Sequence, residues 1–375
     1  MLIRCLSIIT LVLFALACKI DSGSHHTVNS LPENLHFKKE VNNIILLIGD
    51  GMGLTQLYAG FTANKGKLNI EQCRYIGVQK TYSADNYITD SGAAGTALAT
   101  GHKTNNRTLG LSPESVKLKT ISEIAAENGL STGIIVTCSI TDATPAAFYA
   151  HQASRYSDEN IALDFIHHSI DVAICGGRKY FNTRSDHLNL IDSLKVKGYI
   201  VDSNINQLTS SDTSKVIIFT AEDKDPKISE GRGNLLPDAT EKALHILARN
   251  KKGFFLMIEG SQIDWGGHSN DQNYVINELL DFDRAVGKAL QFAAEDSSTL
   301  VIVTGDHETG GLSILNGNLK TGDLTCAFST SNHTGTWIPV FAYGPYAENF
   351  SGFYQNTDVF YKMLNAFNFQ PIDKK

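Results

Sequence analysis

NIILLIGDG, at residues 43–51, combines an unbroken apolar run with an acidic residue at its end. An apolar run without polar alternation is typical of a strand that is buried on both faces, as in parallel sheets. Further short runs of this kind are rich in residues that favour strands. The sequence therefore predicts a buried strand at residues 43–48 and similar strands at residues 133–138, 254–258, 300–304 and 339–343.

Amphipathic segments alternate with these runs and predict helices at residues 120–128, 239–248 and 275–294. Strands that alternate with helices indicate an α/β fold, with a central, mostly parallel sheet and helices on both faces. Residues 177–238 are more polar. We interpret them as an elaboration between core elements.

Acidic residues follow the predicted strands at the same end. Asp50, Glu259 and Asp306 come at or just after three of the runs, and Asp142 follows a fourth after a short turn. Ligands of open α/β sheets bind beyond the carboxyl ends of the strands, so we expect these side chains to line one crevice. Repulsion among them would be unfavourable unless cations lie between them. The pattern therefore predicts a metal site.

Histidines and a threonine near these carboxylates extend the set of candidate ligands. Imidazole together with carboxylate suits zinc, whereas a set of oxygen atoms alone suits magnesium. The residue types thus indicate two kinds of metal site. The candidate ligands are Asp50, Asp142, Thr144, Glu259, Asp264, His268, Asp306, His307 and His333.

Other residues of a type that binds metal are His151 and the adjacent pair His167 and His168. The residues at the strand ends already supply complete ligand sets. We therefore assign no metal to these three histidines.

Ser91 begins a run of small residues, SGAAGTALATG, which favours a helix that another group approaches closely. An isolated Asp-Ser-Gly sequence would most simply cap such a helix. A helix N-terminus also stabilises a phosphate or a developing alkoxide. Ser91 is therefore a candidate nucleophile as well as a candidate cap.

The first residues have the features of an export signal. Residues 1–17 contain Arg4, an apolar run and small residues, which is typical of a signal peptide. The sequence ALAC at residues 15–18 is similar to a bacterial lipoprotein cleavage box with Cys18 as the lipidated residue; ordinary cleavage near Ala17 is the alternative. We expect an exported protein, periplasmic or lipid-anchored to the bacterial envelope, with a polar spacer at 18–39 and a single domain at 40–375.

The net charge of −7 argues against recognition of nucleic acid polymers. A bound anion must be held by locally concentrated positive charge, which metal ions would supply. The glycines at residues 49–53 do not match the dinucleotide-binding fingerprint, because that fingerprint needs a glycine where Leu54 stands.

These motifs, in this order, resemble the alkaline phosphatase family. The resemblance covers nearly the whole chain after residue 40 and implies an alkaline-phosphatase-like fold in the predicted domain. It also implies a homodimer that hydrolyses small phosphate monoesters through a covalent phosphoserine at Ser91. The blocks that carry it are GDGMG (49–53), TDSGAAGTA (89–97), GHKT (101–104), DATPAAFYAHQASR (142–155), EGSQIDWGGH (259–268), VTGDHETGG (303–311) and HTGTWIPVFAYGP (333–345).

The same resemblance implies two Zn²⁺ and one Mg²⁺ as cofactors. It assigns three residues to each zinc, and it makes one residue of the second zinc site bridge to magnesium. The implied ligands are Asp264, His268 and His333 for one zinc, Asp50, Asp306 and His307 for the other, and Asp142, Thr144 and Glu259 together with Asp50 for magnesium.

Other residues would complete the implied site. Arg155 would bind two phosphate oxygens through its planar guanidinium, with Asp90 orienting it. Glu308 would orient His307. Trp265 stands where the best-known bacterial members have a lysine that helps to hold phosphate through water. We therefore expect weaker retention of product phosphate; a packing role for Trp265 is the alternative.

The chain resembles a short bacterial form of the family. Residues 308–332 are too few for the large crown insertion of longer members. Two other functions remain as alternatives: a phosphodiesterase of the same superfamily, and a non-catalytic exported protein that binds phosphate or metal. Arg155 favours monoesters over diesters, and the presence of Ser91 favours catalysis over binding alone.

Overall fold

The computed structural model describes residues 28, 30–32, 37–208 and 215–369. The predicted signal peptide at residues 1–17, the predicted lipidation at Cys18 and most of the predicted spacer lie outside the described residues. Of the helices described, none is both long enough and apolar enough to cross a membrane.

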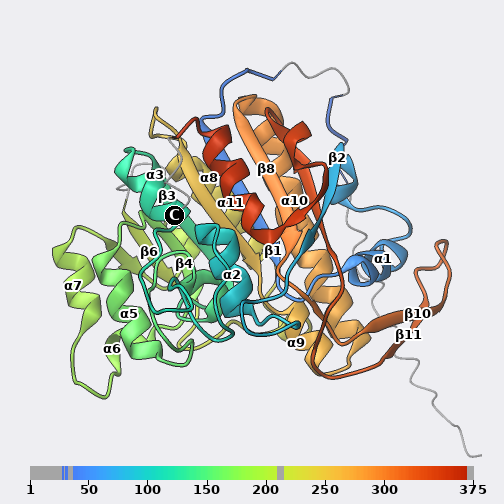
Figure 1. The fold of residues 1–375 in the computed structure, drawn as a ribbon, viewed down its shortest axis with the longest axis horizontal. Coiled ribbons are helices and arrows are strands. Elements are labelled where there is room, and N and C mark those ends of the chain that lie inside the picture. Colours follow the sequence, from blue (N-terminus) through green and yellow to red (C-terminus); the bar gives the residue numbers. More distant parts are fainter. Residues whose placement is uncertain (1–27, 29, 33–36, 209–214, 370–375) are drawn as a thin grey trace, which may run out of the picture.

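A sheet of ten strands runs through the molecule in the order β14–β2–β13–β8–β1–β7–β3–β4–β6–β5 (Figure 1). Neighbouring strands are parallel except at β13, which is antiparallel to both β2 and β8. The predicted mostly parallel sheet is therefore confirmed. The strands are β1 (Asn43–Gly49), β2 (Tyr75–Lys80), β3 (Ser131–Ser139), β4 (Val172–Gly176), β5 (Ile200–Asp202), β6 (Val216–Phe219), β7 (Phe254–Gly260), β8 (Thr299–Gly305), β13 (Ile338–Tyr343) and β14 (Gly352–Gln355).

Helices cover both faces of this sheet, so a central strand such as β1 packs into a hydrophobic core on each side. Ile44, Leu46 and Ile48 of β1 belong to one hydrophobic core, whereas Ile45 and Leu47 belong to the other. Residues of α2, α3, α5, α7 and α11 fill the first core, and residues of α1, α8 and α10 fill the second. Both faces of β1 are buried, which explains its unbroken apolar run.

The helices vary in length from single turns to the long α10, which packs along α8 and the sheet. In Figure 1, α5, α6 and α7 lie at one end of the molecule. The α-helices are α1 (Leu54–Ala63), α2 (Ser91–Thr100), α3 (Ile121–Glu127), α4 (Ala143–Ala146), α5 (Asp158–His167), α6 (Lys179–Asn182), α7 (Leu190–Val196), α8 (Leu235–Leu247), α9 (Ile263–His268), α10 (Gln272–Asp296) and α11 (Asn356–Ala366), and the 3₁₀-helices are η1 (Asn69–Gln72), η2 (Ile205–Gln207), η3 (Ile228–Glu230) and η4 (Ala347–Phe350).

The predicted elements correspond to β1, β3, β7, β8 and β13 and to α3, α8 and α10, with ends that shift by a few residues. The polar residues 177–238 include β5 and β6, which extend the main sheet at one edge.

Two short strand pairs follow β8 and return the chain to the end of the sheet. β10 (Leu312–Gly317) and β11 (Leu324–Phe328) form a hairpin, at the end of the molecule opposite α5–α7 (Figure 1). β9 (Glu308–Thr309) then pairs with β12 (His333–Thr334), so that His333 lies opposite Thr309. This pairing brings His333 close to His307 despite the residues between them.

A buried carboxylate on α10 anchors a neighbouring turn. Asp283 accepts hydrogen bonds from the backbone N–H of Asn69 at 2.8 Å, the backbone N–H of Ile70 at 3.1 Å and Nδ2 of Asn69 at 3.0 Å. Burial raises the pKa of this carboxyl to about 6. The three bonds hold the start of η1 against α10.

We predict that Asp283→Ala lowers the free energy of unfolding by about 3 kcal/mol, because it leaves buried donors without an acceptor. Urea unfolding followed by tryptophan fluorescence would measure the change. Glu295→Ala, at an exposed position of the same helix, is the control and should change stability by less than about 0.5 kcal/mol. Similar losses in the two variants would contradict the anchoring role.

Candidate active site

The candidate active site lies at the carboxyl ends of four neighbouring strands, β8, β1, β7 and β3. Asp50 directly follows β1, Asp306 directly follows β8, and Glu259 is the penultimate residue of β7. The strands are in register, because Gly49 pairs with both Gly260 and Gly305. This register holds the three carboxylates at the same end of the sheet.

Carboxylate oxygens of the kind that bind metal ions lie around the imidazole of His307 and form, with it, the first cluster. Its Nε2 lies 3.4 Å from Asp50 Oδ1 and 3.2 Å from Asp306 Oδ2. Asp306 Oδ1 accepts from the backbone N–H of Gly51 and of His307, but Asp306 Oδ2 and Asp50 Oδ1 are buried and accept no hydrogen bond among the described residues. Buried polar atoms normally have partners. A cation would satisfy both oxygens and the nitrogen at once.

Burial shifts the pKa values of the carboxyl groups and the imidazole in this cluster so that their uncharged forms are favoured. The pKa of Asp50 is raised well above its usual range by burial and by the nearby Asp306 and Asp264 carboxylates. Burial also raises the pKa of Asp306 to about 7 and lowers the pKa of His307 well below its usual range. A divalent cation would favour ionised carboxylates and a neutral imidazole, which are the forms that bind metals.

A second cluster consists of Asp264, His268 and His333. One turn of α9 places His268 Nε2 3.2 Å from Asp264 Oδ2, and His333 Nε2 lies 3.5 Å from Asp264 Oδ1. The other ring nitrogens lie against backbone carbonyls: His268 Nδ1 is 2.7 Å from Ser331 O, and His333 Nδ1 is 2.9 Å from Thr89 O. These contacts leave both Nε2 atoms facing Asp264, as in bound metal sites. The hydrogen bond with Asp264 raises the pKa of His268 to about 9.

The two clusters are in direct contact. The rings of His307 and His333 stack with their centroids 3.5 Å apart. Thr309 Oγ1 donates to Asp264 Oδ1 and lies 3.3 Å from His307 Nδ1. Thr309 was not among the residues predicted from the sequence. The period of two in an extended segment could have indicated it, since Thr309 and His307 lie on the same side of the chain.

Glu308 has a different role from the one expected. Among the described residues, its carboxylate makes no hydrogen bond with His307; it accepts from Gln56 Nε2 at 2.5 Å, from Thr334 Oγ1 and from the backbone N–H groups of residues 311 and 312. Side chains two apart in a strand share a face, whereas adjacent side chains point to opposite faces. Glu308 therefore holds β9 and β12 together behind the imidazoles.

The oxygen-containing set predicted for magnesium is more loosely arranged. Thr144 Oγ1 lies 3.4 Å from Asp50 Oδ2, and Glu259 Oε2 accepts from Ser261 Oγ at 2.5 Å. Burial raises the pKa of Glu259 to about 8. Within the part of the chain that the structure describes, Asp142 and Glu259 do not form a group as tight as the two histidine clusters.

Ser91 is the first residue of α2, and its hydroxyl faces the first cluster. Asp90, not Ser91, accepts the capping hydrogen bond from the backbone N–H of Ala93 at 3.0 Å. Ser91 Oγ lies 3.2 Å from His307 Nε2. The hydroxyl is thus free of the capping role and stands next to the ligand-type atoms.

Arg155 reaches the same helix N-terminus. Its Nη1 donates to Asp90 Oδ2 at 3.1 Å, and its Nη2 donates to Asp142 Oδ1 at 3.4 Å. Asp90 therefore links the start of α2 to the guanidinium, as the resemblance implied.

Trp265, next to Asp264 on α9, is half-buried and packs partly against the core. The Nζ atom of Lys224 lies 4.4 Å from the centroid of its ring, which is the geometry of a cation–π contact.

The sequence and the fold are similar to those of known proteins. A family model described as alkaline phosphatase matches residues 41–327. Alkaline phosphatase 4 of Bacillus subtilis is 34% identical, and the alignment covers 88% of this chain and 90% of that protein.

Solved structures give the same result. The alkaline phosphatase from the Antarctic bacterium TAB5 is 41% identical and matches with a TM-score of 0.84, covering 90% of this chain and 100% of its own. A mutant of the TAB5 enzyme with Mg bound in the M3 site is 40% identical and matches with a TM-score of 0.85 over the same shares. The chain therefore belongs to the alkaline phosphatase family and is a phosphomonoester hydrolase.

Proposed function

We propose that the chain is a zinc- and magnesium-dependent alkaline phosphatase that acts through a covalent phosphoserine at Ser91. The observation that carries this proposal is the distance of 3.2 Å between Ser91 Oγ and His307 Nε2, beside the unpaired oxygens of Asp50 and Asp306. A serine hydroxyl needs an activating neighbour to act as a nucleophile, and metal coordination is one such activation.

Two Zn²⁺ and one Mg²⁺ are the proposed cofactors of the active site. The unpaired buried oxygens and the orientation of the imidazoles fit zinc, and the Thr144 hydroxyl beside Asp50 Oδ2 belongs to a set of oxygen ligands of the kind that magnesium prefers. The solved TAB5 mutant with Mg bound in the M3 site supports magnesium as one of the bound metals. The proposed ligands are Asp264, His268 and His333 for one zinc, Asp50, Asp306 and His307 for the other, and Asp50, Asp142, Thr144 and Glu259 for magnesium.

The residues of the chain suit two successive displacements at phosphorus. Ser91 Oγ attacks phosphorus, an O–P bond to Ser91 forms, and the bond to the ester oxygen breaks; water then attacks and releases Ser91 and phosphate. When bound, the metals would lower the pKa of the attacking hydroxyl and water and neutralise the leaving oxygen.

Arg155 would stabilise the phosphoryl oxygens throughout the two displacements. Its guanidinium has two parallel donors of the kind that bind phosphate in a bidentate manner, and Asp90 holds it beside the N-terminus of α2. The peptide N–H groups of that helix end also favour a bound anion. A phosphate monoester can carry two negative charges and a diester only one, so these positive groups favour monoesters over diesters.

We also propose that the protein is exported, either to the periplasm or to a lipid anchor at Cys18, and that it forms a homodimer. The signal-peptide pattern of residues 1–17 supports export. Membership of the family supports the dimer.

We predict that Ser91→Ala lowers kcat/KM for p-nitrophenyl phosphate by at least about 10³-fold, because it removes the nucleophile. Asp90 still caps α2 in this variant, so the fold should persist. Ser122→Ala, which changes a buried serine on α3, is the matched control and should keep the wild-type rate. Activity within about tenfold of wild type in Ser91→Ala would rule out Ser91 as the nucleophile.

We predict that chelators abolish hydrolysis and that zinc together with magnesium restores it. His333→Ala should bind one zinc fewer per chain than wild type, as measured by metal analysis, and added zinc should not restore its activity. The control is His245→Ala, which changes an exposed histidine on α8. An unchanged zinc content in His333→Ala would contradict the ligand assignment.

We predict that Trp265→Lys binds product phosphate more tightly, with an inhibition constant about fivefold lower, because it adds a positive charge next to Asp264. Trp265→Met separates the gain of charge from the loss of the indole and should not tighten phosphate binding. If the inhibition constant is the same in Trp265→Lys and in wild type, Trp265 does not limit phosphate retention.

A further inference from the structure

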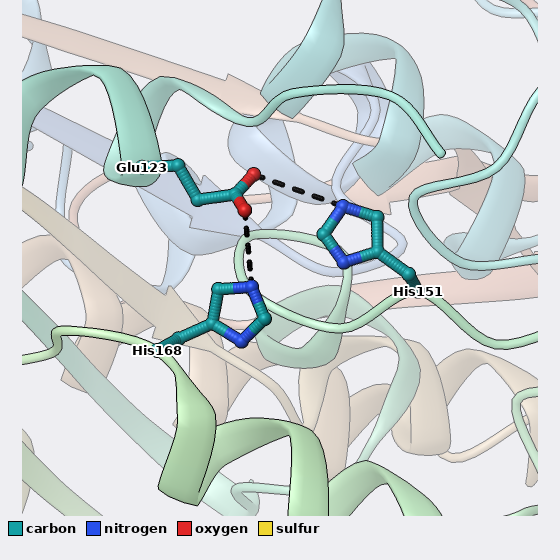
Figure 2. A group of neighbouring side chains, drawn as sticks. All are labelled: Glu123, His151 and His168. Atoms are coloured by element: carbon teal, nitrogen blue, oxygen red, sulfur yellow. Dashed lines mark hydrogen bonds and ion pairs between the residues drawn. The ribbon is translucent and has the colours of Figure 1, made fainter. Parts of the chain in front are cut away.

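Three ligand-type side chains gather outside the active site, on the face of the sheet covered by α3 and α5. Glu123 comes from α3, His151 from the segment after α4, and His168 from the C-terminal end of α5 (Figure 2). One ligand atom from each residue lies within 4.8 Å of the others. The side chains of Glu123, His151 and His168 are 23%, 5% and 17% exposed, so the group is largely shielded from water.

Backbone carbonyls hold one ring nitrogen of each histidine. His168 Nδ1 lies 2.7 Å from Asp164 O, and His151 Nε2 lies 2.9 Å from Leu118 O. A carbonyl oxygen only accepts hydrogen bonds, so these two nitrogens carry protons. In the neutral ring of His168, Nε2 is then left with a free lone pair, as in metal-binding histidines. The Nε2 atom of His151 lies 3.7 Å from Glu123 Oε2 (Figure 2), and the free lone pair of its neutral ring is on Nδ1.

Glu123 is oriented in a comparable way. Its Oε2 accepts from the backbone N–H of Thr120 at 2.7 Å, and the backbone N–H of Glu123 donates to Thr120 Oγ1 at 3.2 Å, which completes a capping box at the start of α3. Its Oε1 lies 3.0 Å from His168 Nε2. Two lone pairs at this distance need either a proton or a metal ion between them.

We propose that Glu123, His151 and His168 form a further metal site, the α3–α5 site, which binds one Zn²⁺ ion. Two imidazoles and one carboxylate are a ligand set that zinc accepts, with water as a fourth ligand. Bonds of about 2.0–2.2 Å from zinc to nitrogen and oxygen place tetrahedral ligand atoms about 3.3 Å apart, close to the separation of Glu123 Oε1 and His168 Nε2. Magnesium and calcium prefer oxygen ligands and fit this set poorly.

The site would join three segments that lie far apart in the sequence. The backbone N–H of His151 and Nε2 of Gln152 both donate to Asp164 Oδ2 of α5, at 2.9 and 2.7 Å. Arg155 follows His151 by four residues. A zinc ion at the α3–α5 site therefore ties α3 and α5 to the segment that carries Arg155, which is a structural role.

Zinc binding by the full-length enzyme, already loaded with its active-site metals, tests the proposal. After equilibrium dialysis against buffered free zinc, we expect one additional zinc per chain and a higher midpoint of thermal unfolding. His168→Asn keeps a donor near Asp164 O but removes Nε2, and it should lose both the additional zinc and the thermal shift. His167→Asn, at the exposed neighbouring position, is the matched control and should bind zinc as wild type does.

Glu123→Gln is a second variant, in case His168→Asn does not fold. Glutamine retains the capping box but not the charged ligand, so the additional zinc should bind at least about tenfold more weakly. Equal zinc contents and thermal shifts in wild type and Glu123→Gln, or no additional zinc in wild type, would overturn the proposal. Zinc content does not depend on Ser91, so this test can fail while the proposed phosphatase mechanism holds.

Discussion

The burial of Asp50 and Asp306 side by side at the end of the sheet is the constraint on which the site depends. Each has a carboxylate oxygen without a hydrogen-bond partner among the described residues, and burial raises both pKa values. An uncompensated buried charge costs several kcal/mol, so this arrangement is stable only if protons or cations neutralise it. The imidazole of His307 faces these oxygens, and the hydroxyl of Ser91 lies 3.2 Å from its Nε2, so the proposed nucleophile lies beside the proposed zinc ligands.

The fold brings the second histidine cluster against the first through a close backbone approach. Gly51, next to Asp50, has a φ of +73°, and a Cβ atom there would lie 2.7 Å from the Cα atom of Asp264. Only glycine suits this position, both for its left-handed conformation and for the space. On the other side, the pairing of β9 with β12 places His333 against His307. Two local features thus join residues that are distant in the sequence into one site.

The strands and helices at the centre of the fold could be predicted because the apolar patterns that cause their burial lie within short stretches of sequence. The apolar run of β1 and the helical periodicity of α10 are visible in the sequence alone, and acidic residues at the strand ends indicated the place of the site. Several contacts of single side chains could not be predicted. Glu308 was assigned to His307 but holds Thr334 and Gln56, and Thr309 was missed. His151 and His168 were noticed but were assigned no metal, because Glu123, which joins them, lies on α3, far from both in the sequence.

Diffraction at the zinc absorption edge, from crystals of the enzyme loaded with zinc and magnesium, would locate the metal ions of the proposed site. We expect two zinc positions at the end of the sheet, one among Asp50, Asp306 and His307 and one among Asp264, His268 and His333. We also expect Ser91 Oγ to lie within about 2.2 Å of the zinc held by Asp50, or to be joined to it through the substrate phosphate. Zinc missing from either cluster, or a Ser91 hydroxyl turned away from both, would contradict the proposed site.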